Sequence, residues 1–82
     1  MKRTRGQKEL ANSFFIRETE VGRLFGLNRS MAKEAFIKAQ RLDLKEVEIF
    51  DTYLVRLSSV LRVLGISERE LKEKVSNEDF NG

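Results

Sequence analysis

Apolar residues recur at intervals of three and four along the first half of this 82-residue chain, which is the spacing of one face of an α-helix. The pattern predicts a first helix over residues 7–16 and a second over residues 19–25. A third helix is predicted from Asn28, whose side chain can cap it, to about Leu42. The apolar positions of the three helices are, in order, Leu10, Ala11, Phe14 and Phe15, then Val21, Leu24 and Phe25, then Met31, Ala32, Ala35, Phe36 and Ala39.

The second half of the chain carries a longer apolar repeat. Its positions alternate three and four residues apart, as in a heptad seam, and comprise Val47, Phe50, Leu54, Leu57, Leu61 and Leu64. Asp43 and Glu46 have the spacing of a helix-start signal, and Gly65 is suited to end a helix. The pattern therefore predicts one long helix over residues 44–64, with the seam as the interface of a homodimer.

The same stretch has an alternative interpretation as a β-hairpin at about residues 45–57, which would be the wing of a winged helix. Residues 47–50 and 53–57 are rich in β-branched and aromatic side chains, which favour strands. The turn would fall at Asp51 and Thr52, however, and threonine is β-branched and resists the positive φ that tight hairpin turns need. The long helix is favoured, and the hairpin remains open.

Further along, Ser67 and Glu70 have the spacing of a capping box that opens a short helix to about Val75. These patterns divide the chain into four parts. They are a flexible basic arm at 1–6, a region of three helices at 7–42, a helical dimerisation region at 43–75 and a flexible tail at 76–82. A chain this short forms one small domain with a limited core, and a second subunit would add buried area.

The charges of the chain are segregated. The formal net charge is +3, but residues 1–42 hold ten Lys and Arg against four Asp and Glu, whereas residues 43–82 hold six against nine. The first part therefore carries +6 and the second −3. A basic half of this kind is typical of a face that binds a polyanion such as nucleic acid.

The missing residue types narrow the chemistry. The chain has no cysteine and no histidine, so it lacks disulfides, thiolate nucleophiles and the ligand set of a zinc finger. We expect no enzyme, no metal, no cofactor and no small-molecule ligand. No apolar run is long enough to span a membrane, and the basic start is not followed by an apolar segment. We expect a cytoplasmic, nucleoid-associated protein.

The most informative stretch runs from Glu18 to Ile37. Gly22 is a small residue where two helices would cross closely, and Gly26, four positions later, tolerates the positive φ of a tight turn. Apolar residues flank both glycines. This stretch resembles the helix-turn-helix of phage repressors and related bacterial and archaeal regulators. The resemblance implies an all-α fold, in which residues 7–42 are a small helix-turn-helix DNA-binding region that here continues into the long dimerisation helix.

The resemblance also implies which residues meet DNA, because the second helix of the motif enters the major groove by its N-terminal end. The base-reading residues would be Asn28, Arg29, Ser30, Lys33 and Glu34, with Ile37 at the margin of this set. The phosphate contacts would be Arg17, Arg23, Lys38 and Arg41, and the minor-groove arm would be Lys2, Arg3 and Arg5. Asn28 can read adenine only if it is not used as the helix cap, and Glu34 can instead pair with Lys38.

The function expected from these features is sequence-specific binding of double-stranded DNA by a homodimeric transcriptional regulator, such as a repressor. One alternative is a component of DNA architecture, partition or packaging that uses the same motif. Another is a protein-interaction helical bundle with no role in DNA binding.

Overall fold

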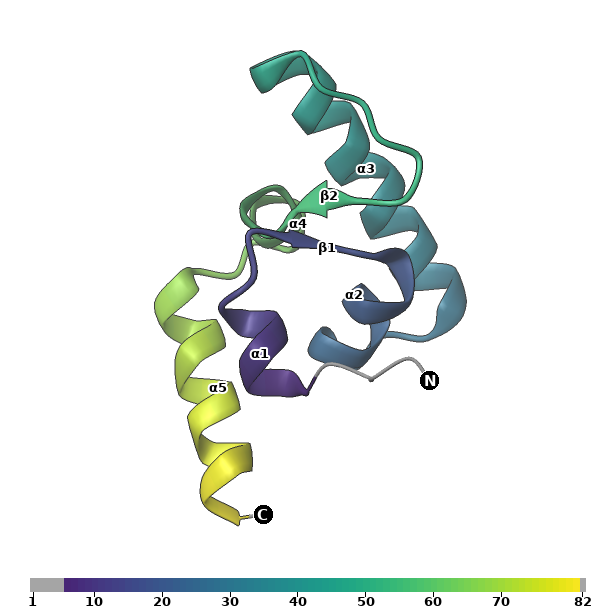
Figure 1. Cartoon of the computed structure of the whole chain (residues 1–82). Helices are drawn as coiled ribbons and strands as arrows, with labels where there is room; N and C mark the ends of the chain where they lie inside the picture. Colours follow the sequence, from purple (N-terminus) through teal and green to yellow (C-terminus); the bar gives the residue numbers. More distant parts are fainter. Residues whose placement is uncertain (1–5, 82) are drawn as a thin grey trace, which may run out of the picture.

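The computed structural model describes residues 6–81 and, among them, the side chains of residues 6–76. The chain forms a small, mostly helical domain with one short two-stranded sheet (Figure 1). In chain order its elements are α1 (Gln7–Ala11), β1 (Phe15–Ile16), α2 (Glu18–Phe25), α3 (Arg29–Val47), β2 (Val55–Arg56), α4 (Leu57–Leu64) and α5 (Glu68–Asn81). No helix within this range is both long and apolar enough to cross a membrane.

The sheet lies in the middle of the molecule, and the helices pack around it. α3 packs against α2, β2 and α4, while α5 lies along α1 (Figure 1). One hydrophobic core joins all of these elements. Its most deeply buried apolar side chains are Leu10, Ile16, Val21, Leu24, Ala39, Val55 and Val60.

The first helix is shorter than predicted and ends at Ala11 instead of Ile16. The Asn12 amide and the Ser13 hydroxyl donate to the carbonyls of Lys8 and Glu9, so the polar side chains that follow the helix bond back to its last turn. The next residues then leave as strand β1. Phe14 and Phe15 are exposed as a result and do not share a buried helix face with Leu10.

The long helix predicted over residues 44–64 is wrong. α3 continues through the predicted boundary at Leu42 to Val47, and Glu48 ends it in the left-handed conformation at φ 56°. A new helix, α4, begins only at Leu57. The seam residues therefore do not share one helix, and Leu57 and Leu61 are buried in the core of the single chain, where they are not available as a dimer interface.

The hairpin alternative is also wrong, although a strand does form within its range. β2 pairs antiparallel with the distant strand β1, with Phe15 opposite Arg56 and Ile16 opposite Val55. The N–H of Leu57 extends the pairing by donating to the carbonyl of Phe14 at 2.8 Å. The partner of this strand is thus about 40 residues away along the chain, which local patterns do not reveal.

The helix starts and ends that depend on local chemistry are confirmed near the C-terminus. Gly65 adopts φ 71° and ends α4, and the N–H of Ile66 donates to Leu61 across the last turn, as in a Schellman motif. Ser67 and Glu70 form the predicted reciprocal capping box at the start of α5. The helix extends to Asn81, beyond the predicted end at about Val75 and into the predicted tail.

Candidate nucleic-acid interface

Helices α2 and α3 form a tight corner at the predicted place. A β-carbon built on Gly22 would lie 3.2 Å from the Leu27 carbonyl oxygen and 3.4 Å from the Ala32 β-carbon, so the two helices touch at this glycine. Gly26 ends α2 at φ 66°, and the N–H groups of Gly26 and Leu27 both donate to the Gly22 carbonyl. Both glycines therefore have the roles that the sequence predicted for them.

Each helix of the corner has a capped N-terminus. At α2, the backbone N–H of Arg17 donates to the carboxylate of Glu20 at 2.8 Å, and Glu20 is itself buried. At α3, the Asn28 side-chain oxygen accepts from the N–H of Met31 at 2.8 Å. Asn28 is thus a helix cap, and bidentate reading of adenine requires the same amide oxygen. Its assignment as a base reader therefore loses its structural support.

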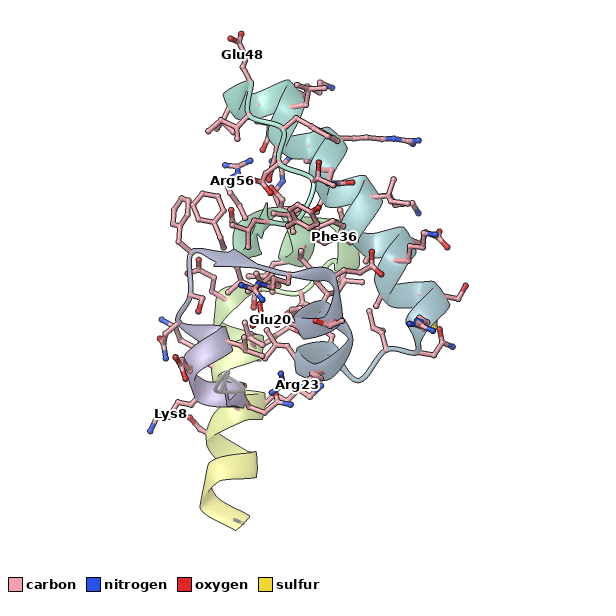
Figure 2. All side chains as sticks on the ribbon, turned by 45° about the vertical axis from the view of Figure 1, so that its right-hand side comes forward. Lys8, Glu20, Arg23, Phe36, Glu48 and Arg56 are labelled. Carbon is pink, nitrogen blue, oxygen red and sulfur yellow. The ribbon has the colours of Figure 1, made fainter. Side chains whose placement is uncertain are left out.

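The outer face of α3 follows from the residues that it buries. Ala32, Ala35, Phe36 and Ala39 are buried against the rest of the molecule, and Figure 2 shows Phe36 directed into it. Because successive helix residues are about 100° apart, the middle of the opposite face is formed by Ser30, Glu34, Ile37 and Arg41. Arg29 and Lys33 lie on the edge of this face toward α2, and Lys38 lies on the edge toward α4.

Most of the predicted DNA-contacting residues of α3 are exposed on or beside this face. They are Arg29, Ser30, Lys33, Glu34, Lys38 and Arg41. Glu34 pairs with Lys38 at 3.0 Å, which is the alternative that the sequence left open, and both groups are largely in water, where such pairs contribute little stability. Met31, predicted to lie inside, is 53% exposed instead.

The remaining predicted contacts lie elsewhere. Arg17 and Arg23 are exposed at the two ends of α2, about 9 Å apart along its axis. The carbonyl of Arg23 accepts a hydrogen bond from the Gln7 side chain, which ties the end of α2 to α1. Lys2, Arg3 and Arg5, the predicted arm, lie outside the described residues.

A buried ion pair that the sequence analysis missed holds the second half of α3 in place. The Asp43 carboxylate accepts from the backbone N–H of Arg56 at 3.1 Å, from its Nε at 2.9 Å, and from the hydroxyl of Ser59. Asp43 is therefore an interior residue of α3 that binds β2 and α4, and its predicted role in a helix start is wrong. Figure 2 shows Arg56 beside the distal part of α3.

Glu46, one turn further along α3, extends this ion pair into a network. It pairs with Arg56 at 2.9 Å and also with Arg62 of α4. Hydrogen bonds from Arg62 and Arg56 lower the pKa of the Glu46 carboxyl, and the Asp43 bond raises the pKa of the Arg56 guanidinium. Both arginines are thereby neutralised by α3, so they add little to the positive charge of its outer face.

The distal end of α3 carries exposed apolar side chains together with the segment that follows it. We refer to Leu44, Val47, Ile49 and Phe50 as the distal patch. The segment runs back beside α3 (Figure 1), where the Gln40 amide donates to the Asp51 and Thr52 carbonyls. The Asp51 carboxylate accepts from the N–H groups of Tyr53 and Leu54 and so fixes the turn. Val47 and Phe50, two of the predicted dimer residues, belong to this patch.

The fold and this surface define a small helical domain with a helix–turn–helix corner and a basic outer face on the second helix of that corner. Comparisons with protein-family models, with curated proteins and with solved structures find no match for this chain. Its function is therefore inferred from the geometry and charge of the molecule itself.

Proposed function

We propose that this protein binds double-stranded DNA with sequence specificity, as a homodimeric transcriptional regulator, and that α3 enters the major groove. The observation that carries the proposal is the outer face of α3 and its edges. They hold five cationic side chains, Arg29, Lys33, Lys38, Arg41 and Lys45, against the single carboxylate of Glu34. The major groove, about 12 Å wide, admits one α-helix, and cations along the helix meet the phosphates that line it.

The roles of these side chains differ with their distance from the N-terminal end of α3. Arg29, Ser30 and Lys33 are closest to that end, which reaches deepest into the groove in helix-turn-helix proteins. Lys38 and Arg41 lie two to three turns further on, where contacts to phosphates are expected. Arg17 at the start of α2 is exposed and is suited to contact the adjacent DNA backbone.

The first prediction distinguishes side chains that contact bases from side chains that contact phosphates. Arg29→Ala should weaken binding to the preferred site by about 1–3 kcal/mol and change binding to random duplex little. Arg41→Ala should weaken binding to every sequence alike, and the slope of log affinity against log salt should fall by about one unit. The preferred site comes from selection on a random DNA pool, and fluorescence anisotropy over a range of salt concentrations measures both variants.

Circular dichroism melts serve as the control that each variant is folded. If the wild-type protein binds no duplex even at low salt, the proposal is wrong and the domain is a protein-interaction bundle. Binding that depends on salt but not on sequence would favour the architecture, partition or packaging role instead. Equal losses by Arg29→Ala on all duplexes would show that α3 lies against the backbone.

We place the homodimer interface at the distal patch, in place of the heptad seam. Val47 lies 14 residues beyond Lys33 on the same helix, about 21 Å along the axis. Two copies that meet at the distal ends of α3, with the helices inclined, can therefore hold their Lys33 positions about 34 Å apart, which is the spacing of successive major grooves on one side of DNA. The patch also exposes four large apolar side chains at the distal end of α3, which is typical of an interaction surface.

The second prediction tests this interface with a matched pair of exposed phenylalanines. Phe50, in the distal patch, is 59% exposed, and Phe14, on the N-terminal side of β1, is 68% exposed. Phe50→Asp should convert a micromolar dimer to a monomer without unfolding it, because only a contact between copies would bury the new carboxylate. Phe14→Asp should leave the dimer intact. Sedimentation velocity measures both, and a monomeric wild-type protein at high micromolar concentration would contradict the dimer.

A further inference from the structure

Ile37 has an unusual position for a branched aliphatic residue. It is 37% exposed and lies in the middle of the outer face of α3. Its neighbours one helical turn away in either direction are Lys33, Glu34, Gln40 and Arg41, all polar. A single exposed hydrophobic side chain is ordinary in itself, so the position of Ile37 among charges that face a polyanion is the informative feature.

The other exposed apolar side chains of α3 lie in different surroundings. Met31 is on the edge toward α4, where it lines a shallow hollow together with Leu27, Val63 and Leu64. Leu44 and Val47 belong to the distal patch. Among the described side chains, Ile37 is thus the exposed apolar residue of α3 that lies between Lys33 and Arg41, two of the cations that we propose to contact DNA.

The chemistry of the major groove supplies one apolar partner for such a side chain. Thymine carries a methyl group at C5 on the groove edge beside its O4 acceptor, whereas the other three bases present no methyl group there. Lys33 and Arg41, one turn before and after Ile37, would hold it against the bases by contacting phosphates or guanine on either side. Gln40, another neighbour of Ile37 on α3, donates its amide N–H groups to the Asp51 and Thr52 carbonyls. It is therefore held toward that segment, and Ile37 is the side chain that can contact a methyl group.

We infer that Ile37 is a specificity-determining residue that selects thymine by packing against its 5-methyl group. This inference rests on the proposed DNA binding, and it adds an apolar reader to a helix whose other contacts are polar. It also moves Ile37 from the margin of the predicted base-reading set to its centre, because the buried residues of α3 set the direction of the outer face.

Replacing single thymines by uracil in the selected site tests the inference, because uracil lacks only the methyl group. We expect one thymine in each half-site at which uracil lowers the affinity of the wild-type protein about three- to fivefold, the value of one buried methyl group. Ile37→Ala should lower affinity for the thymine site by a similar or larger factor, and it should bind the thymine and uracil sites equally. Met31→Ala, the matched control, should retain the full preference for thymine.

The outcomes are distinguishable from failure of the proposed function, in which no duplex is bound at all. If wild-type protein binds its site specifically but shows no sensitivity to uracil at any position, the inference is wrong. A selected site without thymine, or a thymine preference that persists in Ile37→Ala, would overturn it equally. The uracil scan of the wild-type protein decides the matter even if Ile37→Ala proves unstable.

Discussion

Replacing Asp43 with alanine should lower the free energy of unfolding by about 3 kcal/mol or more, because it removes one partner of a buried ion pair. The Asp43 side chain is 6% exposed and accepts hydrogen bonds from the backbone and the guanidinium of Arg56 and from the hydroxyl of Ser59. Without the carboxylate, the Arg56 backbone N–H and the Ser59 hydroxyl lose their acceptor and the guanidinium keeps only Glu46, and each unsatisfied buried group is costly. Urea denaturation followed by circular dichroism measures the change.

Glu46→Ala is the matched control, since Glu46 binds the same guanidinium from a more exposed position on the next turn of α3. Its loss should destabilise the protein distinctly less than the loss of Asp43, because water can replace an exposed partner. If the two variants unfold at the same urea concentration, the buried pair is not what holds α3 against β2 and α4. A wild-type midpoint for Asp43→Ala would contradict the prediction outright.

Replacing Gly22 with valine should destabilise the domain by about 2–3 kcal/mol, because an oversized side chain forces packed elements apart. The β-carbon alone would lie 3.2 Å from the Leu27 oxygen and 3.4 Å from the Ala32 β-carbon, and valine adds two methyl groups beyond it. Either α2 and α3 separate or the turn between them shifts. Thermal melts should show a midpoint lower by roughly 10 °C or more.

Gly22→Ala separates crowding from backbone effects. Alanine meets the same close contacts with only one carbon, and it gains about 1 kcal/mol of helix propensity over glycine, so its net effect should stay within about 1 kcal/mol of the wild type. Valine should also reduce DNA binding at temperatures where the variant is still folded, since the angle between α2 and α3 changes. If valine is tolerated as well as alanine, the helices are not in close contact at this position.

The parts of the fold that were predictable are those encoded by neighbouring residues. Asn28 as a cap, Gly26 and Gly65 as left-handed helix ends, and Ser67 with Glu70 as a capping box are all confirmed. The caps are hydrogen bonds between a side chain and a backbone group three residues away, and the two helix ends depend on the lack of a side chain at one residue. Such local hydrogen bonds and conformations depend little on the rest of the molecule.

The parts that could not be predicted depend on residues far apart in the sequence. The regular apolar spacing from Val47 to Leu64 is shared by the end of α3, an extended segment and α4, so a periodicity that suggested one helix belongs to three elements. Asp43 lies inside α3, where its carboxylate binds Arg56 of β2. β2 in turn is a strand because it pairs with Phe15 and Ile16. No local pattern reveals this chain of dependencies.

The candidate site was predictable in outline but not in register. Exposure of Arg29, Lys33, Lys38 and Arg41 agrees with the predicted set. Asn28 is committed to capping, however, and the inner face of α3 turns Met31 outward and Ile37 to the centre of the outer face. Ala32 and Ala35 are buried as predicted. A helical wheel centred on these two residues and Ala39, with Met31 left out, gives the outer face that the structure has.

The pairing of β1 with β2 also sets the shortest chain that can hold this fold. α2, the turn and α3 all precede Val55 and Arg56, so a chain that stops before these residues leaves β1 without its partner strand and Asp43 without its arginine. The corner that we propose to bind DNA is therefore made by residues in the first half of the chain, whereas the residues that hold it in place lie in the second half. A fragment that ends at the close of α3 therefore holds every residue of the corner and still lacks the contacts that keep α3 in place, so we expect it not to fold as an independent unit.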